Sequence, residues 1–156
     1  MGNQTLLDLG LGVNKVPVTL RTNELAITAF RDLDRFKISS IPVLNENGQV
    51  QTQIGVNDLK GLNSANFPAL LLPVTEYLDI YSPQTSAPIF VLPTSTFSHL
   101  LALFWENQQQ GKRIHRVWIT DANQEVLGLV SLTDVINLID RGINRGVTSQ
   151  KQTVVE

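Results

Sequence analysis

A histidine and an arginine, His115 and Arg116, stand side by side where an apolar run of the sequence begins. The planar guanidinium of arginine suits bidentate contact with phosphate, and histidine can donate a hydrogen bond even when it is neutral. The pair could therefore form an anion site at the mouth of a buried strand. It could equally be the solvated end of that strand, and these two residues alone do not decide between the interpretations.

Two carboxylates, Asp58 and Asp134, each follow the end of an expected strand. Ser131 precedes Asp134 by three residues, which resembles a capping box with Asp in place of the usual Glu or Gln. A carboxylate at a helix N-terminus could instead accept hydrogen bonds from two neighbouring hydroxyls, as a ribose presents them. In the other copy of this pattern, Gly55 stands three residues before Asp58, where a capping box would need Ser. Retention of the acid without its capping partner favours a ligand role for Asp58.

Catalytic and metal sites find little support in the composition. The 156 residues include no Cys and only two His, so thiolate chemistry is excluded and a protein metal cage is not expected. No Ser-His-Asp triad is indicated, and "LGLG" at 9–12 lacks the third glycine of a dinucleotide-binding loop. The net charge of −2 argues against a broad nucleic-acid surface. We expect no catalytic residue, no metal and no nucleic-acid partner.

An internal repeat organises the chain. "ISSIPVLNENGQVQTQIGVNDL" at 38–59 aligns without a gap with "IHRVWITDANQEVLGLVSLTDV" at 114–135, an offset of 76 residues. An offset of 72 aligns the apolar residues further upstream, and the polar stretch 106–112 absorbs the difference. Self-similarity of this kind indicates a repeated structural unit.

The repeat also relates the candidate site residues to one another. Ser39 and Ser40 occupy the positions of His115 and Arg116 in the first copy. All four residues are polar and directly precede an expected strand. The basic pair therefore occurs in one copy only, so we expect at most one well-furnished anion site in each chain.

Each copy predicts the order strand, helix, strand, strand, helix. Strands at 16–20 and 88–92 are followed by helices beginning near Thr22 and Thr94, residues that can cap a helix. Two strands joined by a turn follow, and a closing helix begins at about Val56 or Leu132. The expected fold is mixed α/β (α+β), with two β-α-β-β-α units. Neither unit of roughly 60 residues would bury much core alone, so the two should pack together.

The predicted boundaries are a first unit at 7–62, a linker at 63–87 with a short helix around 74–80, a second unit at 88–142 and a flexible tail at 143–156. The chain contains no run of about 18 apolar residues that would span a membrane. Its start lacks the features of a signal peptide. We therefore expect an intracellular protein, in the cytoplasm or the nucleus, without a membrane partner.

At this point the pattern resembles a known family. Two such units, each closing with an h-x-G/S-x-x-D element, resemble a tandem pair of CBS domains, and "RIHRVWITDANQEVLGLVSLTDVINLI" is the stretch closest to the family pattern. The succession "LDLGLGVNKVPVTLRTN", "KISSIPVLNENGQV", "LLPVTEYL" and "IHRVWITD" is similar to the C-terminal half of the gamma subunits of AMP-activated protein kinases. The resemblance covers roughly residues 7–141.

The resemblance implies a non-catalytic energy sensor: a pseudo-twofold pair whose clefts bind AMP, ADP or ATP and regulate an attached kinase. Carried over by position, Asp58 and Asp134 would hold ribose hydroxyls in different clefts. His115 and Arg116 would contact phosphate. The other implied site residues are Ser131 and Thr133 at the polar end of a cleft, and Val18, Ile38, Ser39, Pro88, Ile89 and Ile114 along the adenine and cleft walls. The ligand would be a nucleotide rather than a cofactor, and the implied partners are a second copy or another CBS pair and kinase subunits of the alpha and beta types.

The chain departs from the gamma-subunit pattern at several positions. Val13 stands where Thr is usual, Gly55 replaces a Ser, and Gln53 stands where an apolar residue is expected. The chain has two units where a gamma subunit has four. These departures support an alternative, a ligand-free CBS module for dimerisation or docking. The cleft that combines Asp58 with His115 and Arg116 keeps more of its groups than the cleft built around Val13 and Asp134.

Overall fold

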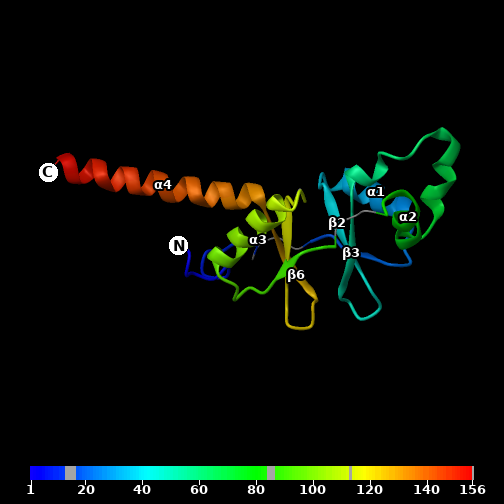
Figure 1. Cartoon of the computed structure of the whole chain (residues 1–156), viewed down its shortest axis with the longest axis horizontal. Helices are drawn as coiled ribbons and strands as arrows, with labels where there is room; N and C mark the ends of the chain where they lie inside the picture. The colour runs from blue at the N-terminus through cyan, green and yellow to red at the C-terminus, as the bar shows by residue number, and fades with distance from the viewer. Residues whose placement is uncertain (13–16, 84–86, 113, 156) are drawn as a thin grey trace.

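In the computed structural model of the chain, the described residues are 1–12, 17–83, 87–112 and 114–155, with side chains described as far as Asn144. They form two mixed α/β units, each built on a three-stranded sheet, that lie side by side (Figure 1). A long helix extends from the second unit to the C-terminal end of the chain (Figure 1). The predicted mixed α/β fold class is confirmed.

The first unit begins with a short strand and a helix, and a hairpin follows. Its elements are β1 (Leu20–Arg21), α1 (Ala26–Arg35), β2 (Ser40–Leu44), β3 (Val50–Gly55), the 3-10 helices η1 (Val56–Leu59) and η2 (Ser64–Leu71), and α2 (Val74–Tyr81). β1 pairs in parallel with β2, and β2 pairs antiparallel with β3. The predicted hairpin turn is present, and Gly48 adopts the left-handed conformation there, with a φ of 79°.

The second unit repeats this order. Its elements are β4 (Phe90–Val91), α3 (Phe97–Gln109), β5 (Arg116–Thr120), β6 (Val126–Ser131) and α4 (Leu132–Val155). Ser40 pairs with Gly55 in the first hairpin, and Arg116 pairs with Ser131 in the second. Both pairs are related by 76 residues, so the alignment of the two hairpins is confirmed.

Upstream of the hairpins, the predicted alignment and helix caps are wrong by small amounts. Leu20 pairs with Val43, whereas Val91 pairs with Ile119, so the upstream offset is 71 and not 72. The helices begin later than expected because the residue before each one is still extended and forms an antiparallel bridge. Thr96, not Thr94, caps α3 by accepting a hydrogen bond from the His99 amide at 3.2 Å. Thr22 does not cap α1, which follows Leu25 without a side-chain cap.

The closing helix that we expected from Val56 is only the four-residue 3-10 helix η1. Gly61 follows η1 closely, and glycine disfavours continuation of a helix. The Asn63 side chain then caps the new 3-10 helix η2 by accepting a hydrogen bond from the Ala65 amide at 2.9 Å. The other closing helix, α4, begins at Leu132 as predicted. The two repeats therefore differ in structure directly after their β-hairpins.

The two hydrophobic cores take residues from outside the predicted units. α2, placed in the linker by the sequence, buries Val74 and Tyr77 in the first core. The N-terminal segment, expected to open the first unit, buries Leu6 and Leu11 in the second core. Main-chain hydrogen bonds hold it there, including one from the Leu6 amide to the carbonyl oxygen of Ser95 at 3.0 Å. Figure 1 shows the N-terminus beside α3.

α4 continues to Val155, across most of the segment that we expected to be a flexible tail at 143–156. No proline interrupts this stretch, and main-chain hydrogen bonding can continue along it. Its described part carries exposed apolar side chains at helical spacing, Ile136, Ile139 and Ile143. Among the described residues, no helix combines the length and the apolar character that crossing a bilayer requires.

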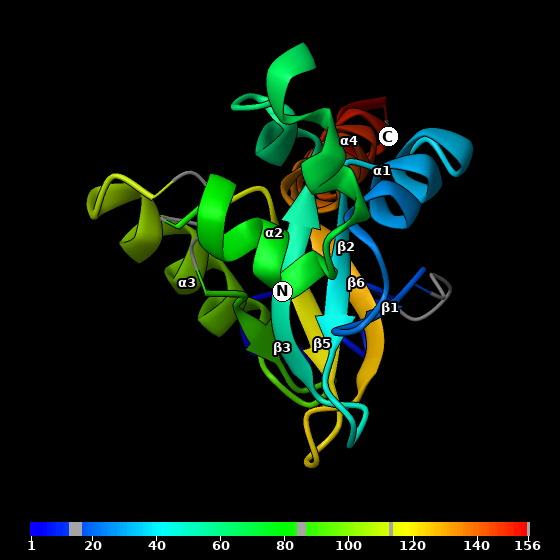
Figure 2. The same ribbon diagram turned by 90° about the vertical axis from the view of Figure 1, so that its right-hand side faces the viewer.

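A pseudo-twofold axis relates the two units. Gln49 and Glu125, which are equivalent positions 76 residues apart, form an antiparallel bridge with each other, as residues on a twofold axis would. The Gln49 side chain donates to the carbonyl oxygen of Asn123 at 3.0 Å. Seen along the long dimension of the molecule, the strands of both sheets lie next to one another and the helices lie outside them (Figure 2). The predicted pseudo-twofold packing is confirmed.

Candidate functional site

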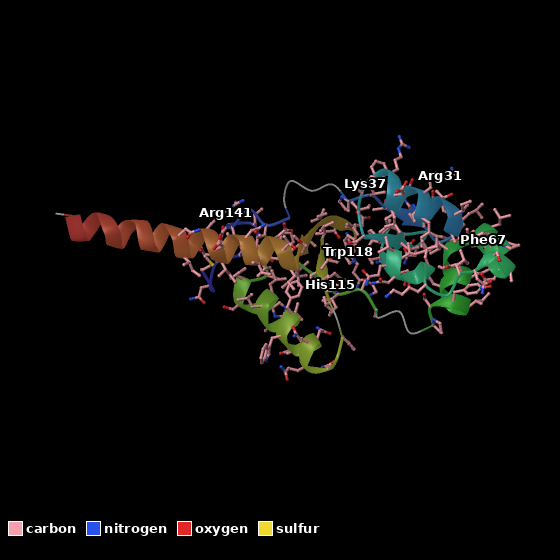
Figure 3. All side chains as sticks on the ribbon, turned by 90° about the horizontal axis from the view of Figure 1, so that it is seen from above. Arg31, Lys37, Phe67, His115, Trp118 and Arg141 are labelled. Carbon is pink, nitrogen blue, oxygen red and sulfur yellow. The ribbon has the colours of Figure 1, made fainter. Side chains whose placement is uncertain are left out.

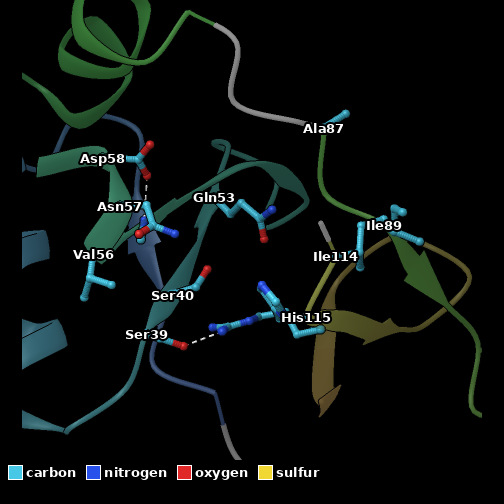
Figure 4. A pocket seen from close by; sticks show the side chains of 12 residues that line it. Ser39, Ser40, Gln53, Val56, Asn57, Asp58, Ala87, Ile89, Ile114 and His115 are labelled. Atoms are coloured by element: carbon cyan, nitrogen blue, oxygen red, sulfur yellow. Dashed lines mark hydrogen bonds between the residues drawn. The ribbon is translucent and has the colours of Figure 1, made fainter. Parts of the chain in front are cut away.

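A cavity of about 410 Å³ lies between the two units. It brings together six residues that the sequence assigned to the site, from both halves of the chain: Ser39, Asp58, Ile89, Ile114, His115 and Arg116. Figure 4 shows Ser39 and Asp58 on the side of the first unit, and Ile89, Ile114 and His115 on the side of the second. The other lining residues are Ser40, Gln53, Gly55, Val56, Asn57 and Ala87.

The hairpin strands position the basic pair. β5 begins at Arg116, and the His115 carbonyl oxygen accepts from the Leu132 amide at 2.8 Å, which connects the start of β5 to the start of α4. Across the axis, the Arg116 guanidinium donates to the Ser39 hydroxyl (Figure 4). Under the pseudo-twofold relation, Ser39 and Arg116 correspond to His115 and Ser40. The strand starts of both units therefore meet at the centre of the molecule.

Arg116 is a cation in a largely desolvated position. Burial lowers the pKa of its guanidinium below the usual range, yet an arginine stays protonated at neutral pH. No carboxylate among the described residues forms a salt bridge with it, and its guanidinium donates instead to the neutral Ser39 hydroxyl. A buried charge without a counter-ion is costly. An anion bound in the cavity would relieve this cost.

Asp58 is held at the start of η1 by the main chain. Its carboxylate accepts from the Gly55 amide at 2.7 Å. A Cβ atom added to Gly55 would lie 2.9 Å from the carbonyl oxygen of Ser39, closer than real Cβ contacts allow. The Val56 amide donates to that same oxygen at 3.2 Å, so the close approach belongs to the fold. The first unit has glycine at this position, whereas the second unit makes the equivalent main-chain bond, from Leu132 to His115 at 2.8 Å, with Ser131 in place.

A second cavity, of about 650 Å³, lies across the axis from the first. Four of the predicted residues line it in addition to Arg116, which lines both cavities: Val18, Ile38, Ser39 and Ser131. Trp118 and Leu129 give it a more apolar wall, and Lys37 is its second cation. Val13, the position where the family usually has Thr, lies outside the described residues.

Asp134 is not among the residues that line the second cavity. It forms the predicted capping box: the Ser131 amide donates to its carboxylate at 2.9 Å, and its own amide donates to the Ser131 hydroxyl at 3.1 Å. It lines a separate cavity of about 260 Å³ with residues 9–12, Asn137, Leu138 and Arg141. Its predicted contact with ribose stays a prediction.

Two predicted wall residues line neither central cavity. Thr133 is exposed on the first turn of α4, and Pro88 is half-buried next to Ile89. In turn, we did not assign Trp118 and Lys37 to a site from the sequence. Trp118 looked like an ordinary core residue of an apolar strand, and its indole N–H donates to Gln53 Oε1 at 3.0 Å. The polar Gln53 at an otherwise apolar position was the only sequence signal for this bond.

The comparisons with known proteins agree with this geometry. The family model "CBS domain" matches residues 79–141. The match assigns residues 79–141 to the CBS family, and the chain as a whole has the fold of a CBS domain pair. A gamma-like regulatory subunit of SNF1-related protein kinase from Arabidopsis thaliana is 32% identical over 108 residues, covering 65% of this CBS pair and 30% of that protein. The gamma subunit of 5'-AMP-activated protein kinase from Dictyostelium discoideum is 24% identical over 135 residues, covering 84% and 23%.

Another relative of the CBS pair is the protein SDS23 of Kluyveromyces lactis, 25% identical over 146 residues, covering 80% of the pair and 27% of that protein. The chain thus spans between 23% and 30% of the length of these three relatives. Among solved structures, CBSX2 in complex with AMP has a TM-score of 0.66 at 15% identity, covering 88% of this chain and 97% of that one. The CBS domains of a Streptococcus pneumoniae transcriptional regulator have a TM-score of 0.63 at 15% identity, covering 85% and 97%. These structures establish the fold.

Proposed function

We propose that this CBS pair is a non-catalytic regulatory module that binds an adenine nucleotide, AMP, ADP or ATP, in the cavity shared by Asp58, His115 and Arg116. The observation that carries the proposal is the half-buried Arg116 guanidinium, which has no carboxylate partner among the described residues and lines a cavity between two units. The AMP complex of the CBSX2 neighbour and the two kinase gamma relatives support the same ligand class.

The cavity offers one group for each part of a nucleotide. Arg116 and His115 would contact phosphate, and the Asp58 carboxylate would accept from the ribose hydroxyls. Ile89 and Ile114 would pack against the base. The volume of about 410 Å³ lies within the range of roughly 300–1,000 Å³ that is usual for small-molecule sites.

Regulation would follow from differential binding. A nucleotide shifts a partner only by the difference in its affinity for two states of the complex. The partners we propose are kinase subunits of the alpha and beta types, together with a second copy of the chain or another CBS pair that completes a four-unit array. We place this activity in the cytoplasm or the nucleus, in line with the kinase relatives.

Calorimetric titration with AMP, ADP and ATP tests the proposal. We expect saturable binding of at least one of them, and an affinity at least about tenfold lower in Arg116→Ala, because charge-assisted hydrogen bonds contribute roughly 1.5–3 kcal/mol. Arg31→Ala is the matched control: Arg31 is exposed on α1, far from His115 in Figure 3, and its loss should leave binding unchanged. No heat with any nucleotide at millimolar concentration would refute the proposal.

The alternative, a ligand-free dimerisation or docking module, is favoured by exposed apolar side chains. Ile136 and Ile143 on α4 are 56% and 60% exposed, and Phe67 and Leu71 on η2 are 55% and 63% exposed. Melting temperatures distinguish the two functions, because a ligand that binds only the native state must raise stability. A melting temperature unchanged by saturating nucleotide, with a dimer seen in sedimentation, would favour the alternative.

A further inference from the structure

The Tyr77 hydroxyl connects α2 to the site. The Tyr77 side chain is fully buried, and its hydroxyl donates to the main-chain carbonyl oxygen of Asp58 at 2.8 Å. Its ring packs edge-on against the Phe30 ring, with 5.5 Å between the ring centroids, and stacks on the Tyr81 ring, with 5.1 Å between the centroids. Burial and the nearby Asp58 raise the pKa of Tyr77, so the hydroxyl remains a donor at neutral pH. The bond therefore joins a rigid aromatic cluster to the residue expected to hold the ribose.

The second unit has no such hydroxyl. Its counterpart of α2 is the N-terminal segment, because the two segments make equivalent main-chain hydrogen bonds. The Val74 amide donates to the carbonyl oxygen of Glu24, and the Leu6 amide donates likewise to that of Ser95. Three residues further along each segment, the Tyr77 amide donates to the carbonyl oxygen of Pro73, and the Leu9 amide donates to that of Thr5. Leu9 therefore occupies the position of Tyr77. A leucine cannot anchor the main chain of Asp134 by a hydrogen bond.

The two aspartates are consequently held by different means. Asp134 exchanges two hydrogen bonds with Ser131 in a complete capping box at the start of a long helix. Asp58 keeps the first of these bonds, from the Gly55 amide, but Gly55 has no hydroxyl that could accept from the Asp58 amide. Asp58 also lies in η1, a 3-10 helix of only four residues, whereas Asp134 lies at the start of the long helix α4. Tyr77 supplies, from α2, a main-chain anchor at the residue itself.

We infer that Tyr77 is a positioning residue for nucleotide binding: its hydroxyl fixes the main chain at Asp58, so that the Asp58 carboxylate stays oriented into the cavity. This inference rests on the proposed nucleotide-binding function. It also couples α2 to the site, because a displacement of α2 would move the anchor of Asp58. In the second unit the corresponding residue, Leu9, cannot form such a hydrogen bond.

The first experiment is a double-mutant cycle read by AMP titration. Tyr77→Phe keeps the ring and removes the hydroxyl, and it should weaken AMP binding roughly three- to tenfold, the value of one hydrogen bond. In an Asp58→Asn background the same change should have no further effect on affinity, which a purely structural role would not predict. Tyr81→Phe, on the same helix and in the same stack, is the matched control and should bind AMP normally.

The second experiment needs no nucleotide. The Gly55 amide donates to the Asp58 carboxylate, so its resonance in a ¹H–¹⁵N spectrum reports the carboxylate position. Tyr77→Phe should shift this resonance, and Tyr81→Phe should leave it in place. An unshifted Gly55 resonance, or AMP affinity within twofold of wild type in Tyr77→Phe, would overturn the inference. Failure of the unmodified chain to bind AMP, ADP and ATP while the Gly55 resonance shifts would refute the nucleotide function and leave Asp58 positioned for another ligand.

Discussion

The two central cavities flank one pseudo-twofold axis and are lined by equivalent positions that carry different side chains. Gln53 and His115 in the first cavity correspond to Leu129 and Ser39 in the second. Ile114 in the first corresponds to Ile38 in the second, so the shared element is an apolar wall. The first cavity thus combines a carboxylate with basic and amide groups, while the second is larger and more apolar. One repeated backbone supports two chemically distinct sites.

Four residues line both cavities, Ser39, Ser40, Val56 and Arg116, and Arg116 is the charged one. Arg116 lines both cavities, whereas Asp58 lines only the first. A single half-buried guanidinium can therefore serve an anion on either side of the axis. Loss of Arg116 should affect both cavities, and loss of Asp58 should affect one.

The largest effect should separate the two aspartates. Asp58→Ala should lower AMP affinity by about tenfold or more, because the ribose hydroxyls lose their charged acceptor. Asp134→Ala should leave affinity close to wild type and instead lower the free energy of unfolding by about 1 kcal/mol, the usual cost of a lost cap. Calorimetry and urea denaturation of both variants give the two quantities. Equal loss of affinity in both would mean that Asp134 also holds a nucleotide.

A smaller effect should distinguish the residues that precede these aspartates. Gly55→Ala should lower the free energy of unfolding by about 1–3 kcal/mol, since the new Cβ is forced against the Ser39 carbonyl oxygen. Ser131→Gly should cost only a few tenths of a kcal/mol, because glycine is tolerated at a helix N-cap. Urea denaturation of the two variants provides the comparison. If Gly55→Ala were as stable as the unmodified chain, the close approach would not constrain this position.

Much of this comparison could be predicted from the sequence, because it depends on local patterns that occur twice. The gap-free alignment of 38–59 with 114–135 placed both hairpins in register, and the turn residues placed their loops. It also aligned Ser39 and Ser40 with the basic pair as equivalent positions. The grouping of Asp58 with His115 and Arg116 followed from the family resemblance, and the structure brings these three residues to one cavity. Their role in binding a nucleotide stays a prediction.

The remainder depends on contacts between distant segments, which no local pattern encodes. The bridge between Thr5 and Thr96 joins residues 91 positions apart and moves the N-terminal segment to the second core. The anchor of Asp58 by Tyr77 crosses from a segment that the sequence assigned to a linker. The helix predicted from Val56 is only a short 3-10 helix. Gly61 indicated an early end, but the prediction followed the helical pattern of the other repeat instead.

The smallest effect concerns the bond that joins the two cavities. Trp118, 1% exposed, lines the second cavity and donates from its indole nitrogen to Gln53, which lines the first. Trp118→Phe keeps an aromatic ring and removes the donor, so the free energy of unfolding should fall by about 1 kcal/mol. Trp105→Phe is the control, because Trp105 is 66% exposed on α3 and should have no measurable effect in urea denaturation. Because the bond crosses between the units, its loss should also loosen their packing, and the amide resonances of β3 and β5 should broaden together in Trp118→Phe. Broadening confined to β5 would show that each unit is rigid by itself and that the two cavities vary independently.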